Sequence, residues 1–131
     1  MLKDELETLR LKQSSEYLKL LEVVKLTEDL AQAIDRRDEV SVRILLTERE
    51  TVLLQLQEMD VAVRDCLLSQ PEADAIRLSA LLNGAEPQNP DEEALSAQVT
   101  KKQQLLEKIN LMDQWISTRL GGKRSFYNSL I

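Results

Sequence analysis

Apolar residues recur along the first part of the chain at steps of three and four residues, or at multiples of those steps. This period is typical of a helix that buries one face, so we predict a helix over residues 2–34. The apolar stripe consists of Leu2, Leu6, Leu9, Leu20, Val23, Leu30 and Ile34. Three polar residues interrupt it: Gln13, Glu16 and Thr27. Three further leucines fall on a different side: Leu11, Leu18 and Leu21. This helix is therefore expected to contact something on two sides.

A second amphipathic helix is predicted up to residue 68. The charged residues 35–38 break the apolar period, and Asp35 or Asp38 would cap the new helix by accepting bonds from free backbone N–H groups. Apolar residues occupy seven of the eight a and d positions of its heptads: Val42, Leu45, Val52, Leu56, Met59, Val63 and Cys66. Arg49 is the polar exception. The short connection makes residues 1–68 an antiparallel hairpin.

The remainder is predicted to be a short helix, a loop, a long helix and a tail. Ser69 followed by Pro71 and Glu72 reads as a helix start, with Ser69 as the cap, and Gly84 offers a left-handed stop for the segment 69–84. Residues 85–90 hold two prolines and form the loop. Asn89 and the acidic residues after it start the last long helix, over 91–120, and the tail follows over 121–131. The apolar stripe of this helix consists of Leu95, Val99, Leu105, Leu106, Ile109, Met112, Ile116 and Leu120.

These elements predict an all-α fold, an antiparallel helical bundle built on the long hairpin, with the last helix alongside it or extending from it. The length of 131 residues favours a single helical domain over residues 1–131. Aromatic residues make up only 3% of the chain, so the core must be aliphatic, which suits helix–helix packing.

Charge and cysteine content narrow the partners and the compartment. The net charge of −6 disfavours nucleic acid and anionic membranes, because phosphate binding needs a basic surface. No apolar run approaches the roughly 20 residues that span a bilayer, and the N-terminus lacks the order of a signal peptide. The lone Cys66 excludes an internal disulfide. We expect a cytoplasmic protein without membrane insertion.

An enzyme is not expected. The chain has no histidine, which removes the usual general base and a common metal ligand. Cys66 lies on an apolar stripe, where a thiol behaves as a small hydrophobic group. Carboxylates that alternate with Lys and Arg on helices usually form a solvated face. We therefore predict no catalytic residues, no cofactor and no metal.

Two aromatic features suggest a binding role, and one arginine is expected to have a structural role or to face solvent. Trp115 is the only tryptophan, and this residue type is enriched in binding hot spots, although packing on the short helix would also explain it. Phe126 and Tyr127 follow two glycines, so they belong either to a docking segment or to a tail folded back on the bundle. Arg49 is expected to pair with Glu16 or Glu28 on the first helix, or to extend to solvent.

The hairpin resembles a known family. The stretch 33–40, with its acidic turn, and the leucine run with a Glu-Arg step over 45–50 resemble the bacterial flagellar type III export chaperones of the FlgN and FliT kind. Residues 105–120 look like their C-terminal helix. FlgN-type members often have a second asparagine where this chain has Asp113, so the choice between the two kinds stays open.

The resemblance implies a cytosolic helical chaperone. It would bind the amphipathic C-terminal helix of a flagellar filament or hook-junction subunit, prevent premature assembly and deliver the subunit to the export apparatus. The partner-binding residues would be Leu105, Ile109, Met112, Trp115, Ile116, Leu120, Phe126 and Tyr127. Two alternatives are a coiled-coil structural protein that forms a homodimer, and a protein that sequesters a regulator.

Overall fold

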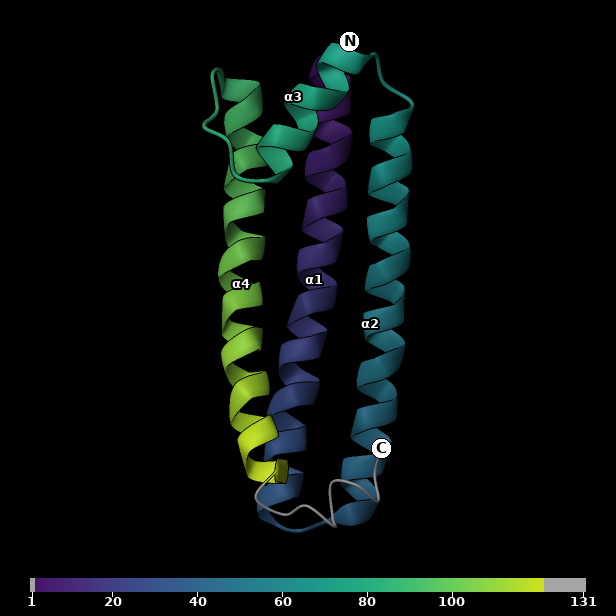
Figure 1. Cartoon of the computed structure of the whole chain (residues 1–131), viewed down its shortest axis with the longest axis vertical. Coiled ribbons are helices and arrows are strands. Elements are labelled where there is room, and N and C mark those ends of the chain that lie inside the picture. Colours follow the sequence, from purple (N-terminus) through teal and green to yellow (C-terminus); the bar gives the residue numbers. More distant parts are fainter. Residues whose placement is uncertain (1, 122–131) are drawn as a thin grey trace.

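In a computed structural model, of which residues 2–121 are described, the protein is an all-α bundle of four helices. The helices are α1 (Leu2–Asp35), α2 (Glu39–Leu68), α3 (Glu72–Leu82) and α4 (Pro90–Gly121) (Figure 1). Their order and, to within about two residues, their ends agree with the elements expected from the apolar periodicity. None of the described helices is long and apolar enough to cross a membrane.

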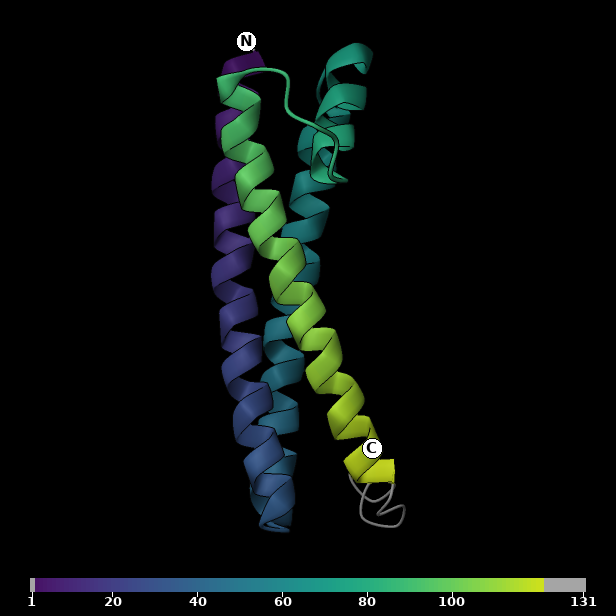
Figure 2. The same cartoon turned by 90° about the vertical axis from the view of Figure 1, so that its left-hand side faces the viewer.

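Helix α1 is the central element, because both α2 and α4 pack along it. The hairpin of α1 and α2 is antiparallel, as predicted, whereas α4 runs in the same direction as α1 (Figure 1). This parallel pairing arises because α2 finishes at the end of the bundle where α1 begins, and the short α3 crosses that same end before α4 starts (Figure 1). Figure 2 shows α4 lying obliquely across the hairpin.

Local hydrogen bonds account for the helix ends. Asp38 caps α2, since its carboxylate accepts from the Ser41 backbone N–H at 3.1 Å and from the Ser41 hydroxyl at 2.6 Å. Asn89 caps α4 by accepting from the Glu92 N–H at 2.9 Å. Gly84, with φ of 98°, ends α3 in the left-handed conformation expected of it.

The expected Ser69 cap of α3 was wrong. The Ser69 hydroxyl donates to the Cys66 carbonyl at 2.7 Å, and its N–H bonds to Asp65, so Ser69 ends α2 instead. The residue before α3 is Pro71, which has no side-chain cap to offer. The sequence signal was ambiguous because a serine can bond the carbonyls of the turn behind it as well as the N–H groups ahead.

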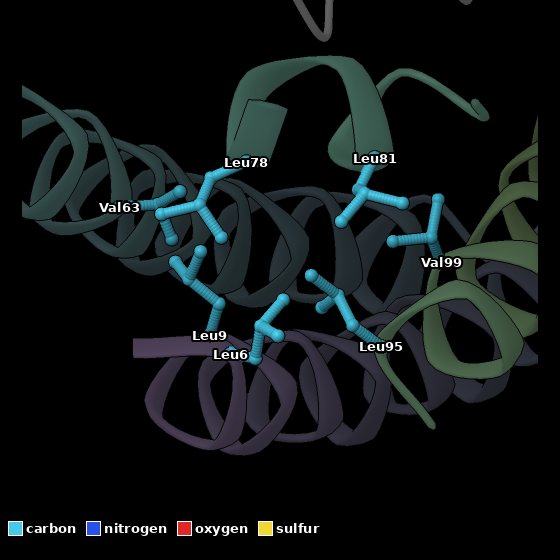
Figure 3. Packing of buried hydrophobic residues seen from close by; sticks show 7 residues of the cluster. All are labelled: Leu6, Leu9, Val63, Leu78, Leu81, Leu95 and Val99. Atoms are coloured by element: carbon cyan, nitrogen blue, oxygen red, sulfur yellow. The ribbon is translucent and has the colours of Figure 1, made fainter. Parts of the chain in front are cut away.

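The core consists of three apolar clusters along the bundle. The upper cluster contains Leu6, Leu9, Val63, Leu78, Leu81, Leu95 and Val99, and thus draws on all four helices (Figure 3). The middle cluster contains Leu20, Val23, Val24, Val52, Leu105 and Ile109. The lower cluster contains Leu30, Ala33, Ile34, Val42, Ile116 and Leu120. The stripes predicted on the first, second and last helices meet in these clusters.

Two polar layers separate the clusters. The Glu16 layer holds Gln13 and Glu16 of α1 with Lys102 of α4. The Arg49 layer holds Thr27 of α1, Arg49 of α2 and Asp113 of α4. The residues that interrupt the predicted stripe of α1 are thus buried inside the bundle, about three helical turns apart from one layer to the next.

Candidate protein-binding groove

Most of the stripe expected to receive a partner is used by the protein itself. Leu105, Ile109, Ile116 and Leu120 are buried in the middle and lower clusters against α1 and α2. Of these four, only Ile116 reaches the groove between α1 and α4, with 7% of its surface exposed. Phe126 and Tyr127 lie outside the described residues.

The two remaining residues, Met112 and Trp115, border an open groove between α1 and α4. Met112 is half-buried, and Trp115 is 41% exposed. The residues that line the groove are Thr27, Glu28, Ala31 and Gln32 from α1, and Leu111, Met112, Trp115 and Ile116 from α4. The groove lies toward the lower end of the bundle in Figure 1, where the C-terminal halves of these two helices run side by side.

Small or inward-turned side chains on α1 leave room for this groove. Ala31 has only a methyl group on the α1 side. Thr27 is fully buried, and its hydroxyl donates to the Val23 carbonyl at 2.6 Å. The larger side chains of α4 therefore stand opposite a shallow wall in which Ala31 is flanked by polar residues.

Trp115 is held in place by its neighbours. The Arg119 guanidinium carbon lies 4.8 Å from the centroid of the Trp115 ring, a cation–π contact. Arg119 also forms an ion pair with Asp35 at the end of α1. Leu111 lies one helical turn before Trp115 and is 66% exposed. The two large apolar side chains thus form one exposed strip along the groove.

The rim of the groove carries a negative charge. Among its eight lining residues, Glu28 is the only charged one, and it is exposed. A partner that inserts apolar side chains here would gain further from a lysine or arginine placed opposite Glu28.

The Arg49 layer lies at the level of the groove and joins the three long helices. Arg49 Nε donates to Thr27 Oγ1 at 3.0 Å, and its Nη2 donates to Asp113 Oδ1 at 2.5 Å. The expectation that Arg49 pairs with Glu16 or Glu28 was wrong, since its carboxylate partner comes from α4. Periodicity on α1 and α2 could not reveal this partner, because the register of a third helix is a tertiary property.

Sequence reasoning missed the α1 side of the groove and Leu111. Leu111 falls between the stripe positions of α4, one helical turn before the only tryptophan. An apolar residue off the stripe, one turn from an aromatic residue, was the signal in the sequence that could have indicated an exposed apolar strip. Nothing in the local pattern of α1 distinguished Ala31 or Gln32 from ordinary surface residues.

The groove can be compared with the positions of the other reactive side chains among the described residues. Within residues 2–121, no group of three or more His, Cys, Asp or Glu side chains could hold a metal ion. Cys66 is half-buried and packs against the upper cluster, at the opposite end from the groove. The groove itself presents aliphatic and indole surface with one carboxylate.

No protein-family model, curated protein or solved structure matches this chain. The likeness to flagellar export chaperones therefore rests on the sequence pattern alone.

Proposed function

We propose that the protein is a cytosolic type III export chaperone that holds an amphipathic helix in the groove between α1 and α4. The observation that carries this proposal is the exposed strip of Leu111 and Trp115 along an apolar groove. Adjacent exposed apolar side chains beside a concave surface are typical of a site that a partner covers. The sequence resemblance names the client class as a flagellar filament or hook-junction subunit, delivered by the chaperone to the export apparatus.

The groove suits a helix with apolar residues on one face. Anchors at i, i+3 or i+4, and i+7 would follow the direction of α4 and cover Leu111, Met112 and Trp115 in turn. A basic residue on the flank of that helix would meet Glu28. Burial of each large side chain is worth about 1.5–3 kcal/mol before the costs of ordering, so affinity on the order of micromolar needs no catalytic group.

Trp115 provides a direct test, because it is the only tryptophan in the chain. A synthetic peptide carrying the C-terminal helix of a hook-junction or filament subunit should shift the tryptophan emission to shorter wavelength as it covers the ring. Calorimetry on the same samples should give a dissociation constant on the order of micromolar. Emission and heat that both stay unchanged at millimolar peptide would refute the proposal.

Matched variants locate the site. Leu111→Gln removes an exposed apolar contact and Ala31→Phe fills the groove, so each should weaken binding about tenfold or more. Leu54→Gln is the control, because Leu54 is also exposed, at 49%, but lies on α2 outside the groove. If the control weakens binding as much as Leu111→Gln, the groove is not the binding site.

The exposed leucines of α1 favour a second candidate, a coiled-coil protein that pairs with another copy of itself. Leu11, Leu18 and Leu21 are all exposed in this structure, although this side of the helix was expected to contact another surface. Light scattering at high micromolar concentration separates the two candidates: a dimer that Leu18→Gln dissociates supports self-association, and a monomer excludes it.

A further inference from the structure

The hairpin of α1 and α2 carries a second concave surface, the hairpin furrow. It consists of two hollows that follow one another along the pair of helices. The upper hollow lies between Leu11 of α1 and Ala62 of α2, and the lower one lies between Lys25 of α1 and Glu48 of α2. No residue lines both this furrow and the groove between α1 and α4, so the two surfaces are distinct.

The furrow faces away from α4 and exposes two leucines. Leu18 comes two residues after Glu16, whose carboxylate lies 3.4 Å from Lys102 Nζ of α4, so Leu18 points about 160° away from that contact. Leu11 lies seven residues before Leu18 and therefore on the same side of α1. Their side chains are 53% and 62% exposed for Leu11 and Leu18 respectively. Apolar surface along the furrow is thus uncovered in the single chain.

The two walls of the furrow carry opposite charges. The α1 wall has one acidic residue, Glu22, and three basic ones, Lys12, Lys19 and Lys25. The charged residue of the α2 wall is Glu48, and the exposed Glu58 lies on α2 between the levels of the two hollows. Two of the lysines also form pairs within α1, Lys19 with Glu22 at 3.5 Å and Lys25 with Asp29 at 3.0 Å. Such exposed pairs are weak, so the lysines remain able to meet a further carboxylate.

A second copy of the chain complements both walls at once. When two hairpins face each other about a two-fold axis parallel to the bundle, α1 of each copy lies antiparallel to α2 of the other, and every residue keeps its level along the bundle. Lys25 and Glu48 line the same hollow and so share a level. The two-fold axis therefore places Lys25 of each copy opposite Glu48 of the other. With the axis perpendicular to the helices, α1 would instead face α1, lysines against lysines, so charge favours the first arrangement.

The size of this face suits a stable dimer. Helix α2 has 30 residues, which corresponds to a length of about 45 Å. Two helices of about 10 Å width side by side offer up to about 900 Å² per copy, close to the roughly 800 Å² per partner of a standard protein interface. Leu11 and Leu18 would be covered in such a contact.

We propose that the protein forms a two-fold symmetric dimer through the hairpin furrow, in which α1 and α2 of both copies make an antiparallel four-helix interface. The proposal gives a face and an orientation to the self-association that the exposed leucines of α1 favour. It does not rest on client binding, because the groove between α1 and α4 lies outside this interface.

Charge reversal tests the pairing of α1 with α2 of the second copy. Sedimentation equilibrium of the full chain should show a dimer at high micromolar concentration. Lys25→Glu and Glu48→Lys should each raise the dissociation constant about tenfold or more, because each reversal turns two attractive pairs into two repulsive ones. The double variant restores both pairs with the charges exchanged and should return the constant towards that of the wild type.

Matched controls separate the pairing from an effect of net charge. Lys108→Glu and Glu107→Lys make the same charge changes at exposed positions of α4 and should leave the dissociation constant unchanged. A monomer at high micromolar concentration, a dimer that neither reversal weakens, or a double variant as weak as the single ones would overturn the proposal.

Disulfide cross-linking distinguishes the two orientations. In a Cys66→Ser background, a copy with Lys25→Cys is mixed with a copy with Glu48→Cys under mild oxidation. We expect the mixed disulfide to form at least about tenfold faster than the disulfide between two Lys25→Cys copies, because Lys25 faces Glu48 of the other copy. Faster cross-linking between two Lys25→Cys copies would show that α1 packs on α1 and would refute this dimer.

Discussion

The ion pair between Arg49 and Asp113 allows a quantitative test of where α4 packs. Arg49→Met removes both of its hydrogen bonds, to Thr27 and to Asp113. A hydrogen bond to a charged group contributes about 1.5–3 kcal/mol when buried, and an exposed ion pair about 0.2–1 kcal/mol. The Arg49 side chain is 17% exposed and that of Asp113 is 42% exposed, so this pair lies between the two limits. We expect Arg49→Met to lower the free energy of unfolding by about 2 kcal/mol and Asp113→Asn by about 1 kcal/mol.

The double variant measures the contact itself. Urea unfolding followed by circular dichroism gives the free energy for each protein. The loss of unfolding free energy in the double variant should be smaller than the sum of the two single losses by a coupling energy of about 1 kcal/mol. Once the first substitution has broken the ion pair, the second has no contact left to break. The control cycle combines Arg49→Met with Glu28→Gln, which should be additive, since Glu28 lies at the groove rim and does not pair with Arg49. Additivity for Asp113 together with coupling for Glu28 would show that α4 is misplaced.

Further predictions concern the ends of the helices and the upper cluster. Leu81→Ala, at a fully buried position, should cost about 2–5 kcal/mol of unfolding free energy, while Ile76→Ala on the exposed side of the same helix should stay within about 0.5 kcal/mol. If urea unfolding showed equal losses of unfolding free energy for these two variants, the packing of α3 would be contradicted. The hydrogen bond from Arg77 holds the pKa of buried Glu92 below its ordinary value of 4.5. The stabilisation by ionised Glu92 is therefore fully present above pH 4.5, and it is lost as the pH falls through the lower pKa that Glu92 has in the folded protein. Glu92→Gln should therefore lower stability at neutral pH and flatten the acid loss, measured by urea unfolding from neutral to acidic pH; an unchanged acid profile would count against it. Asp38→Ala should cost about 1 kcal/mol by removing the cap of α2, and a loss of zero would show that the cap does not contribute.

The helices themselves were predictable because their signals are local. A period of three and four residues, the capping residues Asp38 and Asn89, and the left-handed stop at Gly84 act over one or two turns. The hairpin followed from the shortness of the connection between its two helices. The error at Ser69 arose where two local hydrogen bonds competed, and the chain chose the one to the preceding turn.

The candidate site could be predicted only in part. The apolar stripe of the last helix was identified, but Leu105, Ile109, Ile116 and Leu120 are covered by α1 and α2. Apolar periodicity predicts that one face of a helix is buried, but it does not predict which residues cover that face. Of the described partner-binding residues, Met112, Trp115 and the largely buried Ile116 border the groove, opposite the small side chain of Ala31.

By itself, the sequence determined the number of helices, their ends and the faces that avoid water, since these depend on neighbours within a few residues along the chain. The sequence also showed that Gln13, Glu16 and Thr27 interrupt the apolar stripe of the first helix, but it did not show which residues of the other helices they meet. Only the tertiary structure decided that α4 runs parallel to α1 and in which register it packs. That register brings Lys102 to Glu16, Asp113 to Arg49, and Trp115 to an open groove. The physical reason is that such contacts join residues remote in sequence, and their energies depend on how three helices share one core.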